Sequence, residues 1–296
     1  MTQEALAISH GAATIVNAIA LGRGAAFGVD LFTKAHVKLT SESKVIEAEI
    51  TSDPKENPLL IQKAVTAVLK HFQLENEFGA KVKTSSNIPI ARGLKSSSTA
   101  ANAVALATLG ALAKTLDDLE VVNLGVQAAF DAKVTVTGAF DDACASYFGG
   151  LVVTDNVNCK LVKQEPLTED YVVLFQIPPK KTYTADSDMS KLQTIKPQVE
   201  AAYNLAVKGY YWEALTLNGL AYSAAYGFNA KTAVDALAAG AKASGLCGKG
   251  PATTAVVPKD KVDAVKAAWQ VYEGQIIQAS LNQEKARCLG NGNGNR

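Results

Sequence analysis

Residues 88–101 read IPIARGLKSSSTAA, in which a proline and a glycine bracket an arginine and four consecutive hydroxyl side chains follow a lysine. An alanine-rich run begins there and predicts a helix from about Ser97 to Lys114. The first turn of a helix has backbone N–H groups without intrahelical partners, and its dipole end is positive. Phosphate binds readily at such a position, so this stretch is a candidate anion site.

Two interpretations of these hydroxyl side chains compete. One serine at the helix start would satisfy a free backbone N–H, which is ordinary N-capping. Four hydroxyls next to Gly93 and Lys95 exceed what a cap needs, and glycine lets the backbone pass close to a ligand. We therefore favour a phosphate-binding loop. It is not a Walker A loop, because no GKS or GKT follows a GxxxxG spacing here.

A second motif, TGAFDDACASYFGG over residues 137–150, carries Asp141 and Asp142 in tandem after a glycine turn. Adjacent side chains point in different directions on a regular element, so the two carboxylates need not share a role. A positioned carboxylate can accept the proton of a hydroxyl that attacks a phosphoryl group. An aspartate at a helix start can equally act as a cap, and position alone leaves both interpretations open.

Two further glycine-rich segments lie far apart in the chain. In ASGLCGKGPATTAVV, residues 243–257, the glycines form either a tight connection into a strand or a close approach to a ligand. Lys249 in this segment could reach phosphates or be an ordinary exposed lysine. Near the N-terminus, Arg23 lies between two glycines. Its guanidinium could clamp a carboxylate or phosphate, or lie in a surface turn.

The order of the expected elements predicts an α+β fold. Strand patterns fill residues 4–50, and helical runs follow without regular βαβ alternation. A helix is expected over residues 116–130, capped by Thr115. The character of the chain changes near Asp155, which predicts two domains, residues 1–155 and 156–296.

Composition excludes several classes of protein. The 296 residues are 48% hydrophobic, enough for a sizeable core, and 29 basic residues balance 28 acidic ones. This balance gives no case for a nucleic-acid or anionic-membrane partner, and no apolar run reaches the ~20 residues of a membrane span. The four cysteines form no CxxC pair, and the N-terminus lacks a signal-peptide pattern. We expect a cytoplasmic protein with reduced thiols and no zinc site.

Pro89, three further residues and GLKSSSTAA resemble the PxxxGLGSSAA motif of the GHMP kinases, which include galactokinase, homoserine kinase and mevalonate kinase. Lys95 departs from this pattern, since the group usually has glycine or another small residue there. The glycine-rich segment over residues 243–257 resembles a loop that folds over the phosphate loop in this group. The resemblance implies a set of ATP-binding residues: Pro89, Ala91, Arg92, Gly93, Leu94, Lys95, Ser96, Ser97, Ser98, Gly248 and Lys249.

The resemblance also assigns roles to the acidic residues. In the group, a catalytic aspartate follows a glycine turn and precedes a short helix that ends in two glycines, and Asp141 matches it. Magnesium is held by a hydroxyl and by an acid upstream, positions that Ser97 and Asp131 match. A solvated carboxylate at a helix end is the alternative for Asp131. Arg23 is expected to assist catalysis by supporting a substrate carboxylate or transition-state charge.

Within the group, NAIALGRGAAFGVDL, IPIARGLKSSSTAANA and TGAFDDACAS look most like the archaeal shikimate kinases. This resemblance implies an N-terminal domain similar to domain 2 of ribosomal protein S5 and a C-terminal ferredoxin-like domain, with ATP between them. It implies ATP-dependent phosphorylation of the shikimate 3-hydroxyl, on the way to chorismate and the aromatic amino acids. The alternatives are another small-molecule kinase of the group, such as homoserine kinase, or a ligand sensor without turnover. The oligomeric state is left open.

Overall fold

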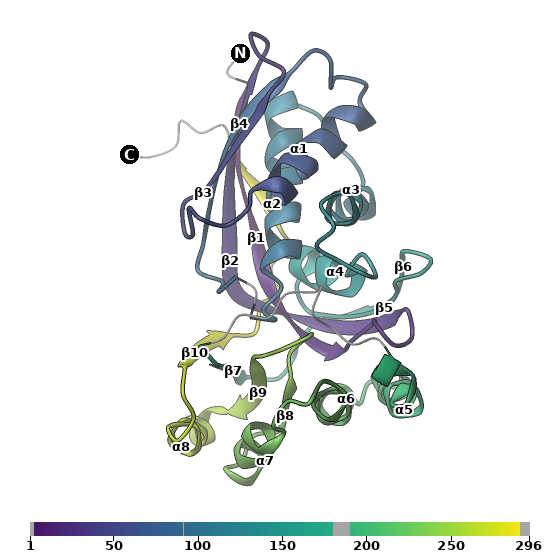
Figure 1. Ribbon diagram of the computed structural model, residues 1–296, viewed down its shortest axis with the longest axis vertical. Coiled ribbons are helices and arrows are strands. Elements are labelled where there is room, and N and C mark those ends of the chain that lie inside the picture. The colour runs from purple at the N-terminus through teal and green to yellow at the C-terminus, as the bar shows by residue number, and fades with distance from the viewer. Residues whose placement is uncertain (1–2, 91, 180–189, 291–296) are drawn as a thin grey trace.

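Two β-sheets and the helices packed on them organise the chain (Figure 1). The structure is a computed structural model that describes residues 3–90, 92–179 and 190–290. The strands are β1 (Glu4–Val16), β2 (Arg23–Thr40), β3 (Ile46–Ile50), β4 (Gly79–Ser86), β5 (Leu151–Asp155), β6 (Lys160–Glu165), β7 (Tyr171–Ile177), β8 (Ala243–Leu246), β9 (Thr253–Pro258), β10 (Gln275–Ser280) and β11 (Arg287–Gly290). The helices are α1 (Leu59–His71), α2 (Ser96–Leu112), α3 (Asp118–Asp131), α4 (Phe140–Phe148), α5 (Lys196–Val207), α6 (Tyr211–Tyr226), α7 (Lys231–Ala238) and α8 (Val262–Trp269).

The first sheet has the strand order β11-β1-β2-β4-β3, and β5 and β6 continue it from the N-terminal end of β2. The strands β1 and β2 form a long antiparallel pair, while β3 runs parallel to β4. Helices α1 to α4 lie together on one side of this sheet (Figure 1). Small side chains such as Ala35, Ala64 and Ala103 are fully buried between helices and sheet, so the two layers approach closely.

The second sheet is antiparallel and has the order β10-β7-β9-β8. Counted along the chain, this is fourth, first, third, second, and the elements follow one another as strand, helices, two strands, helix and strand. That arrangement is the split βαβ pattern of ferredoxin-like domains. Together with the first sheet it confirms the predicted α+β class. No helix in the described part of the chain is both long and apolar enough to cross a membrane.

One apolar core joins the two sheets. Phe27 on β2 packs edge-to-face on Trp212 of α6, with ring centroids 5.5 Å apart. Phe175 on β7 and Tyr222 on α6 belong to the same buried cluster. Because this core is continuous, loops that come from both halves of the chain are held in a fixed relation to each other.

The predicted boundary after residue 155 stays a prediction. Strand β6 extends the first sheet beyond that point, and β11 pairs with β1 although it lies near the end of the chain. The helix expected over residues 116–130 starts slightly later than expected. Asp117 and Glu120 form a reciprocal capping box there, so Asp117, and not Thr115, precedes the first turn of α3.

Candidate active site

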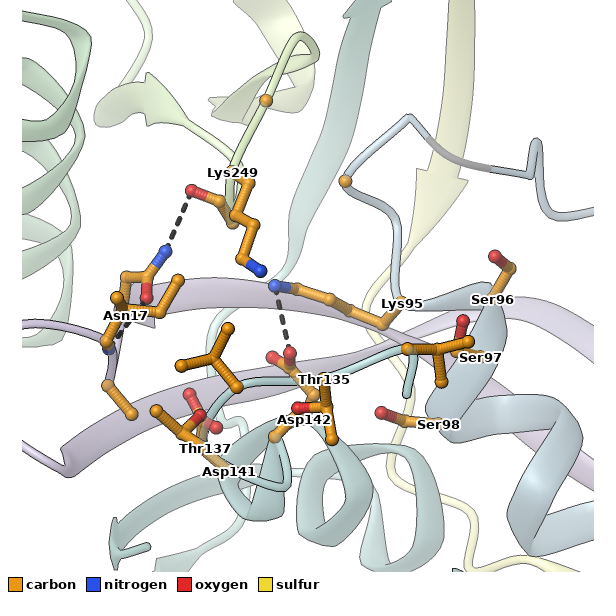
Figure 2. Close-up of a pocket in the computed structure, with 18 residues that line it drawn as sticks. Asn17, Lys95, Ser96, Ser97, Ser98, Thr135, Thr137, Asp141, Asp142 and Lys249 are labelled. Carbon is orange, nitrogen blue, oxygen red and sulfur yellow. Dashed lines mark hydrogen bonds and ion pairs between the residues drawn. The ribbon is translucent and has the colours of Figure 1, made fainter. Parts of the chain in front are cut away.

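A cavity lies where the N-terminus of α2, the loop before α4 and the loop between β8 and β9 meet (Figure 2). Each of the three motifs found in the sequence supplies part of its wall. The lining consists of residues 17–19, 93, 95–98, 134–137, 139, 141, 142 and 248–250.

The loop before α2 is built to approach the loop after β8. Gly93 has a φ of 89°, and a Cβ there would lie 2.4 Å from the carbonyl oxygen of Cys247. Only glycine permits both features. The Cys247 thiol donates a hydrogen bond of 3.1 Å to the Gly93 carbonyl. The two loops are therefore in direct contact beside the cavity.

The loop after β8 is also tied to the first sheet. The Asn17 side-chain amide donates to the Gly248 carbonyl at 2.9 Å, and the Gly248 N–H donates to the Thr14 hydroxyl at 3.0 Å. The Asn17 N–H donates in turn to the Asn218 side chain on α6 at 3.1 Å. These bonds fix the position from which Lys249 extends into the cavity (Figure 2).

Lys95 has the left-handed backbone conformation, with a φ of 64°. A side chain at this conformation costs about 1 kcal/mol, which a glycine would avoid. Its ammonium lies 3.1 Å from Asp142 Oδ2, and the two side chains are only 9% and 12% exposed. Burial opposes charge on Lys95, but Asp142, Cys247 and Asp141 together outweigh it and raise the pKa of Lys95. The other oxygen of Asp142, Oδ1, is buried and has no hydrogen-bond partner among the described residues.

Lys249 points toward Lys95 across the cavity (Figure 2). Burial and the nearby Lys95 ammonium lower the pKa of Lys249 to about 8. Both lysines are thus largely charged at neutral pH, with the Asp142 carboxylate near them. Two neighbouring ammonium groups at the N-terminus of a helix form a site for an anion of more than one charge.

Asp141 lies on the first turn of α4 and is 3% exposed. Its Oδ1 accepts a hydrogen bond of 2.8 Å from the Asn156 amide. Its Oδ2 fits against Gly24, where a Cβ would lie only 2.5 Å away. Burial and the adjacent Asp142 carboxylate raise the pKa of Asp141 to about 7, against the opposing effect of Lys95. A carboxylate with this pKa can accept a proton near neutral pH.

Most of the predicted site residues meet at this cavity. Those that line it are Gly93, Lys95, Ser96, Ser97, Ser98, Asp141, Gly248 and Lys249. Pro89, Arg92 and Leu94 do not line it. The Arg92 guanidinium donates to the Pro178 carbonyl at 2.7 Å, and Leu94 is buried in the core between the sheets. Ala91 lies outside the described residues.

Arg23 and Asp131 are not among the residues that line the cavity. The Arg23 guanidinium pairs with Glu200 at 3.2 Å and lies over the Tyr203 ring. Its predicted catalytic role stays a prediction. Asp131 is exposed at the end of α3 and accepts a hydrogen bond of 2.8 Å from Gln127. This is the helix-end environment expected under the alternative interpretation of Asp131.

Sequence reasoning missed several residues of the site. Thr135 and Thr137 line the cavity, and their hydroxyls directly before a glycine turn were a usable signal. Asn17 and Asn156 carry no local signal, because their roles depend on contacts with Gly248 and Asp141, which lie far away in the chain.

Comparison with known proteins agrees with this geometry. The family model of the GHMP kinases N terminal domain matches residues 60–150. The chain is 47% identical over 288 residues to a shikimate kinase of Methanosarcina mazei, covering 97% of each chain. It is 39% identical over 283 residues to a shikimate kinase of Halobacterium salinarum, covering 95% of this chain and 98% of the relative.

Solved structures support the fold. Mevalonate kinase of Methanococcus jannaschii superposes with a TM-score of 0.76 at 17% identity, covering 94% of this chain and 98% of that one. A homoserine kinase from Cytophaga hutchinsonii gives 0.74 at 17% identity, covering 98% of each chain. The predicted GHMP kinase fold is therefore confirmed. With its nearly full-length similarity to archaeal relatives, the chain belongs to the shikimate kinase family within the GHMP kinases.

Proposed function

We propose that this protein transfers the γ-phosphoryl group of ATP to the 3-hydroxyl of shikimate. One observation carries the proposal: Lys95 at the N-terminus of α2 and Lys249 in the loop after β8 line one cavity with Asp141, a buried carboxylate whose pKa is raised to about 7. This combination provides an anion site and a base in one place. Membership of the shikimate kinase family supplies the identity of the acceptor.

The phosphates of ATP are held by the N-terminus of α2 and the loop after β8. The hydroxyls of Ser96 to Ser98, the free backbone N–H groups of the first turn and the ammonium groups of Lys95 and Lys249 all border the space that they occupy. A second cavity shares Ser96, Ser97 and Val134 with the first and extends toward α1. In this proposal, the second cavity binds the nucleoside of ATP.

Asp141 is the base. As the shikimate oxygen forms its bond to the γ-phosphorus, its proton passes to the Asp141 carboxylate, and the bond from that phosphorus to the bridging oxygen of ADP breaks. Asn156 and Gly24 orient the carboxylate from two sides. Lys95 and Lys249 stabilise the charge that develops on the transferred group.

Magnesium fits this site as an ion that arrives with the nucleotide. Ser97 offers a hydroxyl oxygen in the cavity, and Mg²⁺ bound to phosphates needs few protein ligands. The described residues contain no cluster of three or more His, Cys, Asp or Glu side chains that could hold a metal by themselves. When bound, Mg²⁺ neutralises charge on the β- and γ-phosphates. Asp131 has no part in this proposal, because it does not line the cavity.

A coupled assay of ADP release with shikimate, homoserine and mevalonate tests the function. We expect shikimate to be the preferred acceptor and Asp141→Asn to lower kcat by about 10²–10⁴-fold. Asp131→Asn serves as the matched control, since it removes an exposed carboxylate outside the cavity and should retain turnover. Preference for homoserine, or an Asp141→Asn protein with near-normal turnover, would defeat the proposal.

A further inference from the structure

We propose that Lys95 is a positioning residue that favours the ionised form of the buried Asp141 carboxylate, and that Asp142 holds the Lys95 ammonium in place for this purpose. The proposal rests on the function above, in which Asp141 is the base. It concerns a lysine at a position where the family resemblance predicts a small residue, and it gives the tandem aspartates different roles.

The first argument is the backbone at Lys95. Its φ of 64° lies in the left-handed region, where glycine would be favoured. A lysine kept at this position has to offset its conformational cost through its side chain. The side chain is directed inward, and its ammonium contacts Asp142 at 3.1 Å with little exposure to solvent.

The second argument is the space made for the ammonium. Gly248 has a φ of 60°, and a Cβ there would lie 2.6 Å from Lys95 Nζ. The absence of a side chain at Gly248 is therefore what lets the ammonium lie beneath the loop after β8. The same loop is held to Asn17 and Thr14 by hydrogen bonds, so this space is fixed by the fold.

The third argument is the charge balance around Asp141. Two adjacent carboxylates in a site with little solvent disfavour simultaneous ionisation, and a nearby cation relieves this. Lys95 is the cation that contacts Asp142, and its charge also acts on the adjacent Asp141. Oδ2 of Asp142 contacts the Lys95 ammonium, and Oδ1 has no hydrogen-bond partner among the described residues. The contact with Lys95 is therefore the one polar contact that the described residues provide for the Asp142 side chain.

The other titratable groups that face Asp141 do not change charge near neutral pH. Burial raises the pKa of the Cys144 thiol well above its ordinary value and also raises the pKa of the Tyr222 hydroxyl. Asn156 is neutral and donates its hydrogen bond at every pH. Lys249 faces Lys95 and Asp142, and it loses its charge only near pH 8. Besides burial, the pH at which Asp141 titrates therefore reflects the neighbouring Asp142 carboxylate and Lys95 ammonium.

The proposal predicts shifts of opposite sign for two variants. Lys95→Gly removes the cation while suiting the left-handed backbone, so it should fold and should raise the pH at which Asp141 ionises. Asp142→Asn removes the neighbouring negative charge but keeps an oxygen for Lys95, so it should lower that pH. Each shift should be about one pH unit. Lys133→Gly is the matched control, because Lys133 is an exposed lysine whose φ is 57°.

Two measurements test whether Lys95→Gly and Asp142→Asn shift the ionisation of Asp141 in opposite directions. The first is a carboxylate ¹³C NMR titration of the ligand-free protein, with the Asp141 signal assigned by its loss in Asp141→Asn. The second is the pH profile of kcat/KM with shikimate, whose acid limb should move up for Lys95→Gly, down for Asp142→Asn and not at all for Lys133→Gly.

A purely structural pair would lower kcat in both variants without moving the acid limb in opposite directions. Shifts of the same sign, or no shift in folded variants, would overturn the proposal. The NMR titration does not require turnover. A wild-type protein inactive toward shikimate would count against the proposed function and would leave the test of Lys95 intact.

Discussion

Lys249 and Lys95 bring two ammonium groups into one cavity, and this has a consequence for nucleotide affinity. Because burial and Lys95 lower the pKa of Lys249 to about 8, the free protein loses one of the two charges as pH rises through that value. A bound polyphosphate favours the charged form. The affinity for ADP should therefore be nearly constant below about pH 7 and should fall by up to tenfold per pH unit above about pH 8.

Calorimetric titration with ADP across this pH range measures the effect. Lys249→Met should bind ADP more weakly at neutral pH and should lose most of the pH dependence. Lys133→Met, which removes an exposed lysine, should behave as the wild type does. Equal affinity of the wild type at about pH 7 and about pH 9.5 would show that Lys249 does not contact the phosphates.

Individual residues were predictable from the sequence where their neighbours in the chain define their role. Gly93, Ser96 to Ser98 and Asp141 belong to compact motifs, and all of them line the cavity. Arg92 looked equally suitable because it is an arginine beside a glycine. Its guanidinium turns toward Pro178, a residue 86 positions away that no local pattern reveals.

At the scale of elements, the close packing of the α2 and β8–β9 loops predicts that Gly93 tolerates no side chain. Gly93→Ala combines a φ of 89° with a Cβ only 2.4 Å from the Cys247 carbonyl oxygen. We expect a loss of several kcal/mol in the free energy of unfolding or a displaced phosphate loop. Thermal unfolding and the KM for ATP report these two outcomes.

Gly227→Ala is the control for backbone strain alone. Gly227 has a φ of 72°, but a Cβ there meets no atom within 4 Å. The Gly227→Ala substitution should lower the free energy of unfolding by about 1 kcal/mol and leave the KM for ATP unchanged. If both variants lowered the midpoint of unfolding equally, contact between the two loops would not be what requires glycine at position 93.

The sequence predicted long elements better than short ones. Sequence patterns gave α2, α3 and the strands of the first hairpin, because their buried faces repeat over several turns or strand residues. Strands β8 and β11 have only 4 residues each and were not expected. Their pairing with β9 and β1 depends on partners elsewhere in the chain, so a single sequence carries little signal for them.

At the scale of the whole molecule, the buried Asp141 carboxylate is expected to lower the free energy of unfolding. Its pKa is raised from 3.8 to about 7, so the folded protein binds more protons than the unfolded chain between these values. The contribution of Asp141 to the free energy of unfolding therefore decreases as pH rises from about 4 to 7. Asn cannot ionise, so Asp141→Asn should be more stable than the wild type by a few kcal/mol at about pH 8.

Urea denaturation of both proteins at about pH 4 and about pH 8 checks this. The two should differ least at the lower pH, where Asp141 is protonated in the folded protein and about half protonated in the unfolded chain. Glu42→Gln provides a control at an exposed acid outside the cavity. If Asp141→Asn were no more stable than the wild type at the higher pH, burial of the ionised Asp141 carboxylate would not lower the free energy of unfolding.

The pairing of β11 with β1 also has a consequence for the order in which the chain can fold. During synthesis, residues 4–16 leave the ribosome well before residues 287–290, which form the strand that covers part of their outer edge. Until residues 287–290 emerge, β1 presents open backbone hydrogen-bonding groups along part of its length, and such edges associate with other chains. The nascent protein therefore depends on a strand made late in synthesis to close an edge that forms early.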